Sequence, residues 1–286
     1  MPELPEVESV RMQLEKYVVG HTIERVEINY QKCFQGDSDN VVGGKVRGIR
    51  RFGKALSIDL DNKHSIVIHI KLTGQLIYRG PNLKSPPKLS KKVLDGIPGK
   101  HTHVIFRLNH KGILYYNDVR KFGWIKIVRS DRVEEISFIK SLGPEPLDGM
   151  TLKKFSELTK STKRVIKTLL MDQSKIGGVG NIYANDALWL ARISPTRSAG
   201  ELSDLEIKRL FNSIEDVLRE GLKRGGASEL SFVTPDGTDG DYQDHFLAYG
   251  KEGDNCPRKE CRKVSSKFSK IKMGGRGTYF CPACQK

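Results

Sequence analysis

The sequence predicts an α+β protein with several domains, and three features of the chain lead to this expectation. Apolar residues recur at helical spacing over residues 6–19, and alternating apolar segments typical of β-strands follow from about 23 to 130. Helical spacing returns beyond residue 150, and four of the five cysteines lie in the last 31 residues. We therefore expect an N-terminal β-sandwich or barrel with a flanking helix, followed by a helical domain and a small cysteine-rich module.

The N-terminal half is predicted to hold one helix and then a series of strands. Val7, Val10, Leu14 and Tyr17 recur on one face of the helix, and Gly20 is a typical stop signal. Strands are expected where apolar, often β-branched residues alternate or run together: ALSIDL (55–60), SIVIHI (65–70), HVIFRL (103–108) and GWIKIV (123–128). Glycine and proline cluster at 79–99, which predicts a long loop.

The C-terminal half begins after SLGPEPLDG (141–149), whose prolines and glycines fit a hinge. Helical spacing covers 151–172 and 203–222, and a glycine-rich turn with another helix lies between them, in 175–195. Residues 225–241, rich in Gly, Ser, Asp and Thr, are expected to form a mobile loop. The predicted domains are an N-terminal β-sandwich (1–131), a linker (132–149), a helical domain (150–222), a loop (223–243) and the cysteine module (244–286).

The composition favours an intracellular protein with a polyanionic partner. Lys and Arg number 49 against 34 Asp and Glu, so the net charge is +15, which is typical of a nucleic-acid-binding protein but also of a merely basic, solvated surface. No apolar run reaches the roughly 18–20 residues of a membrane helix. The chain begins MPELPEVE, which is acidic and unlike a secretion signal.

The clustered cysteines predict a structural zinc site. Cys256 and Cys261 have four residues between them, and Cys281 and Cys284 follow after 19 more with two between them. Two such pairs can close a tetrahedron of thiolates around Zn²⁺, which would hold a hairpin too small for its own core. Two disulfides, or a chance clustering of cysteines, are the alternatives. Cys33 is interpreted as an ordinary buried thiol.

The segment between the cysteine pairs is strongly basic. Its cationic side chains are Arg262, Lys263, Lys267, Lys270, Lys272 and Arg276. A zinc-bound hairpin with this charge could bind phosphates of a nucleic-acid backbone.

The N-terminus carries a candidate nucleophile. Removal of Met1 would expose the secondary amine of Pro2, with a pKa of about 8, so part of it is neutral and able to attack a carbon centre. Glu3 and Glu6 could act as acid or base beside it. The alternative is structural: Pro2 and Pro5 merely start a helix.

Five segments in order along the whole chain resemble the formamidopyrimidine-DNA glycosylase family, whose relatives include endonuclease VIII. They are MPELPEVE (1–8), FGKALSIDL (52–60), NDVRKFG (117–123), LLMDQSKIGGVGNIYANDAL (169–188) and GGRGTYFCPACQK (274–286). The resemblance implies a helix–two-turns–helix in the helical domain and a terminal zinc-finger β-hairpin. PELPE, rather than PEGPE, favours the branch that acts on purine lesions.

The resemblance also implies a bifunctional DNA glycosylase and AP lyase that excises 8-oxoguanine and formamidopyrimidines in base excision repair and nicks the strand by β,δ-elimination. Pro2 would attack C1′ and form a Schiff base, and Glu3 would protonate the sugar ring oxygen. Lys54 would act in base release and β-elimination, and Arg276 would assist elimination and bind phosphate. Glu6 would position the sugar or the nucleophile.

A base that is flipped out leaves a gap in the duplex. The resemblance implies that three side chains, the wedge residues, insert into the duplex and fill this gap. Arg120 would contact the orphaned cytosine, and Phe122 would stack into the helix. The third wedge residue is Leu72, in HIKLTG (69–74), where the family usually has HLGMSG or HLGMTG. Leu72 is still apolar and close to Met in volume, and Lys71 stands in place of a glycine. The loop 225–241 would close over the flipped base.

Further DNA-backbone contacts are expected from Asn181, His101, Lys163 and Lys167. The finger departs from the usual C-x2-C-x16-C-x2-C spacing, but its first pair remains within the range of zinc ligands. The expected cofactor is one structural Zn²⁺ and the expected partner is double-stranded damaged DNA, bound by a monomer at the bacterial nucleoid. The rival hypotheses are an endonuclease VIII-like enzyme for pyrimidine lesions, an inactive DNA-binding protein and a protein with another acidic substrate.

Overall fold

The computed structural model describes residues 2–286, and the chain divides into two compact units. The first unit comprises Met1–Lys140 and Gly221–Gln243, and the second comprises Ser141–Glu220 and Asp244–Lys286. Met1, whose removal the sequence analysis expects, lies outside the described residues. The division at Lys140 falls inside the predicted linker, while the finer domain boundaries stay predictions.

The first unit begins with helix α1 (Leu4–Val18), as predicted from the apolar spacing. Glu3 is the extended N-cap residue, and its N–H donates to the carboxylate of Glu6 at 2.7 Å, which satisfies one backbone donor at the helix start. Pro5 lies in the first turn, where no helical hydrogen bond is lost. The helix buries Leu4, Val7, Val10, Leu14 and Tyr17.

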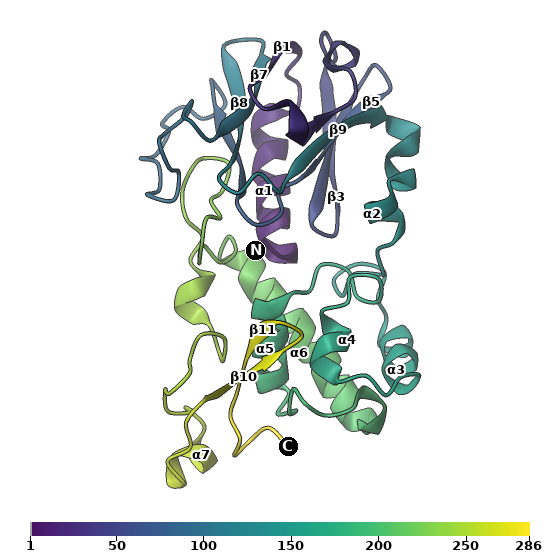
Figure 1. Ribbon diagram of the computed structural model, residues 1–286, viewed down its shortest axis with the longest axis vertical. Coiled ribbons are helices and arrows are strands. Elements are labelled where there is room, and N and C mark those ends of the chain that lie inside the picture. Colours follow the sequence, from purple (N-terminus) through teal and green to yellow (C-terminus); the bar gives the residue numbers. More distant parts are fainter. Residues whose placement is uncertain (1) are drawn as a thin grey trace. The chain divides into compact units, whose positions relative to one another are not determined.

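Two sheets follow, and α1 contacts strands of both (Figure 1). The four-stranded sheet has the order β1 (Ile23–Ile28), β7 (Thr102–Leu108), β8 (Gly112–Asp118), β6 (Gly74–Arg79). The five-stranded sheet has the order β2 (Phe34–Gln35), β9 (Trp124–Arg129), β5 (His64–His69), β4 (Ala55–Leu60), β3 (Val46–Phe52). All neighbouring pairs are antiparallel except β2 and β9.

One apolar core joins α1 to both sheets. It includes Val10 from α1, Ile58 and Ile68 from one sheet, and Leu76 and Phe106 from the other. Alternate residues of each strand face this core, which is the period-two pattern of the sequence. The predicted N-terminal β-sandwich with a flanking helix is therefore confirmed. The short helix α2 (Ser137–Lys140) ends this part of the chain.

The second unit is helical and ends in a hairpin. Its helices are α3 (Leu152–Lys160), α4 (Ile166–Leu170), α5 (Asn181–Leu190), the main part of α6 (Asp204–Lys223) and α7 (Lys259–Lys263). Strands β10 (Ser269–Met273) and β11 (Arg276–Phe280) pair antiparallel. Gly274 and Gly275 connect them with φ of +55° and +76°, a two-residue turn that requires glycine-like freedom.

The helical pattern at 151–172 is not one continuous helix, as the spacing alone could suggest. Helix α3 ends at Lys160, and Val165 is extended and pairs with Ser198, while the Ile166 N–H donates to the Arg197 carbonyl at 2.8 Å. These contacts to a distant segment override the local helical preference. Short 3₁₀ turns lie at Gln31–Cys33, Ser38–Asn40, Ser130–Glu135, Ala199–Glu201 and Tyr242–His245. No helix within residues 2–286 is both long and apolar enough to cross a membrane.

Candidate active site and DNA-binding surfaces

The N-terminal turn of the first unit is buried. Pro2 is buried, and Glu3 and Glu6 are 2% and 1% exposed. One oxygen of Glu6 accepts the Glu3 N–H, and the other accepts the N–H of Ala227 at 2.7 Å. Gly226 approaches so closely that a Cβ there would lie 2.8 Å from Glu6 Cγ. Glu6 therefore holds the predicted nucleophile's turn and the start of the predicted capping loop together.

Lys54 lies in the turn between β3 and β4 and is only 4% exposed. Arg51 ties this turn to α1, because its guanidinium donates to Glu8 at 2.7 Å and to the Gly53 carbonyl at 3.3 Å. Burial acts against ionisation of Glu8, but hydrogen bonds from Arg11 and Arg51 prevail and lower its pKa. The ion pair thus fixes the turn that carries Lys54 against the first half of α1.

His69, which the sequence analysis did not single out, is a buried side chain near Lys54. It ends β5, pairs with Ala55 across the sheet and is 3% exposed. Burial, together with the nearby charges of Lys71 and Lys54, lowers the pKa of His69 to about 3, so the ring is neutral at neutral pH. The sequence offered one indication of this proximity. Lys54 precedes the predicted strand 55–60, His69 lies near the end of the next predicted strand, 65–70, and antiparallel pairing of the two strands brings these ends together.

The three predicted wedge residues lie in two loops of the first unit. Leu72 is half-buried in the β5–β6 loop (residues 70–73). Arg120 and Phe122 lie in the β8–β9 loop (residues 119–123), and both are exposed. Phe122 is 53% exposed, and the Arg120 guanidinium lies 4.8 Å from the centre of its ring. An exposed aromatic ring beside a cation is a chemically suitable surface for stacking on bases.

The remaining predicted backbone contacts have different surroundings. His101 is mostly buried, with Nε2 3.4 Å from the Asp95 carboxylate. Lys163 is exposed in the second unit, at the edge of a depression that it forms with Lys160 and Ser198. These placements leave Lys163 accessible to a phosphate.

Lys167 requires a correction, because it was expected to contact the DNA backbone. The side chain is 1% exposed, and its ammonium donates to the Gly277 carbonyl at 3.0 Å and to the Thr278 hydroxyl at 2.6 Å. The ammonium group therefore donates into the β10–β11 hairpin rather than toward solvent. The periodic pattern of the sequence does not distinguish a buried lysine from an exposed one.

Asn181 is the first residue of α5, after the extended Gly180. Its backbone carbonyl accepts a hydrogen bond from the Asn185 amide at 2.6 Å, and the Asn185 side-chain oxygen accepts the N–H of Tyr279 in β11 at 2.7 Å. Asn185 therefore links the start of α5 to the hairpin. Arg276, the exposed first residue of β11, belongs to the same hairpin.

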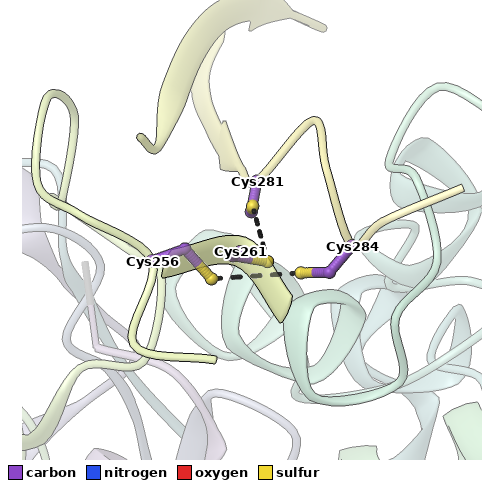
Figure 2. Close-up of side chains that lie close together, drawn as sticks. All are labelled: Cys256, Cys261, Cys281 and Cys284. Atoms are coloured by element: carbon purple, nitrogen blue, oxygen red, sulfur yellow. Dashed lines mark hydrogen bonds between the residues drawn. The ribbon is translucent and has the colours of Figure 1, made fainter. Parts of the chain in front are cut away.

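The four clustered cysteines have the geometry of a zinc site. Their buried sulfur atoms all lie within 4.8 Å of one another and point toward a common centre (Figure 2). Cys256 and Cys284 have sulfurs 4.0 Å apart, and Cys261 and Cys281 have sulfurs 3.6 Å apart. Zinc–sulfur bonds of about 2.3 Å place tetrahedral ligands about 3.8 Å apart, whereas a disulfide needs about 2.05 Å. The separations fit zinc and exclude the disulfide alternative.

The surroundings of the thiols also fit a bound cation. Burial opposes ionisation of Cys281, but hydrogen bonds from the Ser266 hydroxyl and nearby backbone N–H groups lower its pKa. Burial raises the pKa of Cys261 and of Cys284, so four thiolates in this pocket need a divalent cation. All four positions are protein ligands, which makes the zinc structural.

The chain matches three family models along its length. The formamidopyrimidine-DNA glycosylase N-terminal domain matches residues 1–125, and the formamidopyrimidine-DNA glycosylase H2TH domain matches residues 142–232. The zinc finger found in FPG and IleRS matches residues 253–286.

Relatives of similar length cover the whole chain. The formamidopyrimidine-DNA glycosylase of Pelotomaculum thermopropionicum is 38% identical over 100% of this chain and 99% of its own, and that of Listeria innocua is 37% identical over 100% of both. A Lactococcus lactis FPG mutant solved with Fapy-dG-containing DNA is 33% identical, with a TM-score of 0.84 over 100% of both chains. The MutM (Fpg) protein of Thermus thermophilus is 34% identical, with a TM-score of 0.84 over 99% of this chain and 98% of its own.

The sandwich unit, the helical unit and the four-thiolate finger define a zinc-containing DNA glycosylase of the DNA-repair class. Within that class, the chain belongs to the formamidopyrimidine-DNA glycosylase family. The resemblance noted in the sequence, the fold class and the single structural zinc are confirmed.

Proposed function

We propose that the protein is a bifunctional glycosylase and AP lyase that removes 8-oxoguanine and formamidopyrimidines from double-stranded DNA. The observation that carries this proposal is the buried turn of Pro2, Glu3 and Glu6 at the start of α1, together with a buried Lys54 whose turn is tied to the same helix by Arg51 and Glu8. Lactococcus lactis relatives have been solved with Fapy-dG-containing DNA and with DNA containing an abasic site, which supports lesions of this class as substrates.

Base release begins at Pro2. Its neutral amine attacks C1′ as the bond from C1′ to the base nitrogen breaks, and the proton lost from the proline nitrogen balances the proton taken up by the departing base. Glu3 supplies a proton to the sugar ring oxygen, which opens the ring and yields the Schiff base. Glu6 holds the turn in place through its two hydrogen bonds to backbone N–H groups.

Strand cleavage follows by β- and then δ-elimination of the two phosphates. Lys54 would assist the proton transfers of base release and β-elimination. Arg276 would bind the departing phosphate with its planar guanidinium, and Asn181 would present its amide and the N-terminus of α5 to a neighbouring phosphate. Lys163 and His101 would contact the backbone further away.

The lesion must leave the duplex before this chemistry can occur. Leu72, Arg120 and Phe122 would fill the gap, and the 223–243 loop would cover the flipped base. Because its substrate is double-stranded damaged DNA, the protein would act at the bacterial nucleoid, and we expect it to act as a monomer.

A second candidate is an enzyme that prefers oxidised pyrimidines. It is favoured by one observation: a wild-type Lactococcus lactis relative, 34% identical, has been solved with DNA containing an oxidised pyrimidine. A lesion panel separates the two candidates by single-turnover rates.

The experiment compares duplexes carrying 8-oxoguanine, a formamidopyrimidine, an oxidised pyrimidine or no lesion, and identifies the end groups of each product. We expect fastest release of the purine lesions and phosphate at both ends of the gap. Glu3→Gln should slow base release by about 100-fold. Glu24→Gln, at an exposed position of β1, is the matched control and should stay within about twofold. Binding without release of any base would contradict the proposal.

A further inference from the structure

Asp118, the last residue of β8, is a buried carboxylate that the chemistry above does not use, and it is 1% exposed. Its Oδ1 accepts the hydroxyl of Thr73 in the β5–β6 loop and the N–H of Arg120 in the β8–β9 loop, the latter at 3.2 Å. Its Oδ2 accepts the Gly123 N–H at 2.8 Å and the Tyr116 hydroxyl at 3.5 Å. One side chain therefore joins the two loops that carry the wedge residues.

A direct link between the loops reinforces this junction. The hydroxyl of Thr73 donates to Asp118 and accepts the Arg120 N–H at 2.9 Å, so it uses both of its hydrogen-bonding roles. Gly123 comes so close that a Cβ there would lie 2.0 Å from the Tyr116 hydroxyl. Larger residues at position 123 are excluded, which keeps the β8–β9 loop tight against the carboxylate.

Both loops contain a strained residue next to a wedge residue. Lys71, before Leu72, has φ +50°, and Lys121, before Phe122, has φ +58°. A left-handed conformation costs a residue with a side chain roughly 1–2 kcal/mol and persists only where the surroundings enforce it. In the β5–β6 loop the Lys71 N–H donates to His69 Nδ1 at 3.0 Å, and in the β8–β9 loop Asp118 accepts the N–H groups of Arg120 and Gly123, on either side of Lys121 and Phe122.

We propose that Asp118 is a positioning residue that holds the β5–β6 and β8–β9 loops together through hydrogen bonds, so that Leu72, Arg120 and Phe122 enter the duplex together. This inference rests on the proposed function of these three residues as the wedge. Without these hydrogen bonds, each loop would place its side chains independently, and the gap left by the flipped base would be filled poorly. The residue acts through the wedge and does not touch the reacting nucleotide.

Two variants of the junction test the proposal. Asp118→Asn keeps the size of the side chain, but its NH₂ group cannot accept, so the two donors on that side lose their acceptor. Thr73→Val removes only the bridging hydroxyl at a half-buried site, and Thr73→Ser restores it. The matched control is Asp59→Asn, because Asp59 accepts from Arg50, Ser57 and Ser65 within the other sheet.

The first measurement is the ratio of two single-turnover rates: base release from a duplex with 8-oxoguanine, and strand cleavage at a pre-formed abasic site. A hydrogen bond to a charged group corresponds to roughly 10- to 150-fold in an equilibrium constant, so Asp118→Asn and Thr73→Val should lower the ratio by about tenfold or more. Thr73→Ser and Asp59→Asn should keep the ratio within about twofold of wild type. Equal losses on both substrates would show that Asp118 supports only the fold and would overturn the proposal.

The second measurement does not depend on catalysis. A 2-aminopurine beside a stable abasic analogue becomes more fluorescent when an inserted wedge disturbs its stacking. At saturating protein, Asp118→Asn and Thr73→Val should reduce this increase to less than half, and the Asp59→Asn control should retain it. If wild type released no damaged base, the proposed function would fail, and this signal would still decide the role of Asp118. If Asp118→Asn does not fold, Thr73→Val and its serine rescue decide it.

Discussion

Replacement of Lys167 by methionine tests how the hairpin of the second unit is held. Methionine has a similar length but no donor, so the Gly277 carbonyl and the Thr278 hydroxyl lose a charged partner at 3.0 and 2.6 Å. Each buried acceptor left without its hydrogen bond costs about 1–3 kcal/mol, and removal of a buried charge offsets part of this cost. We expect the free energy of unfolding to fall by about 3 kcal/mol, which lowers Tm by roughly 6–12 °C.

The assay is thermal unfolding of the full-length zinc-loaded protein, together with DNA affinity. Lys163→Met is the matched control for Tm alone, because Lys163 is exposed and only four residues away but is itself a proposed DNA contact. The control should leave Tm nearly unchanged, while Lys167→Met should lower Tm and weaken DNA binding through the hairpin that carries Arg276. An unchanged Tm with weakened DNA binding would refute this reasoning and restore Lys167 as a direct contact.

Three further predictions concern the metal, the phosphate contacts and pH. Cys261→Ser should release the zinc and weaken DNA binding while the β-sandwich stays folded; metal analysis that finds no zinc in active wild-type protein would contradict this. Arg276→Ala should reduce the slope of log binding constant against log salt concentration by roughly one unit and also slow strand cleavage at saturating protein. Lys272→Ala should change the slope alone. If both variants changed only the slope, Arg276 would be removed from the catalytic residues. Hydrogen bonding from Arg197 lowers the pKa of Glu206 from 4.5 to about 2, so its stabilisation is present above pH 4.5 and is lost as the pH falls toward 2. Glu206→Gln should therefore cost about 1 kcal/mol at neutral pH and progressively less below pH 4.5 in unfolding titrations; a constant difference across this range would contradict the ion-pair explanation.

Much of the fold could be predicted because its local signals agree with its long-range contacts. The alternation in 55–60 and 65–70 becomes the buried strands β4 and β5, and the spacing over 6–19 becomes α1. The break after Lys160 could not be predicted, because it depends on pairing between Val165 and Ser198. The order of the strands in each sheet could not be predicted from the sequence either, because pairs such as β1 with β7 join segments far apart in the chain.

The candidate site was predictable where chemistry follows sequence spacing. The four zinc cysteines could be identified because two short-spaced pairs are sufficient to indicate a tetrahedral site. Lys167, His69 and Asp118 were misjudged or missed because their roles depend on burial and on partners from other elements. A charged residue in a helical pattern is usually exposed, so only the folded chain shows a lysine directed into a hairpin.

The most direct test of the account is to trap the covalent intermediate and locate it. The protein is incubated with a duplex containing 8-oxoguanine opposite cytosine in the presence of borohydride, which reduces a Schiff base to a stable amine. The adduct is then characterised by intact mass and peptide mapping. The account predicts one DNA strand attached to the nitrogen of Pro2, in protein that has lost Met1. An adduct on Lys54, or Met1 retained in active enzyme, would contradict it.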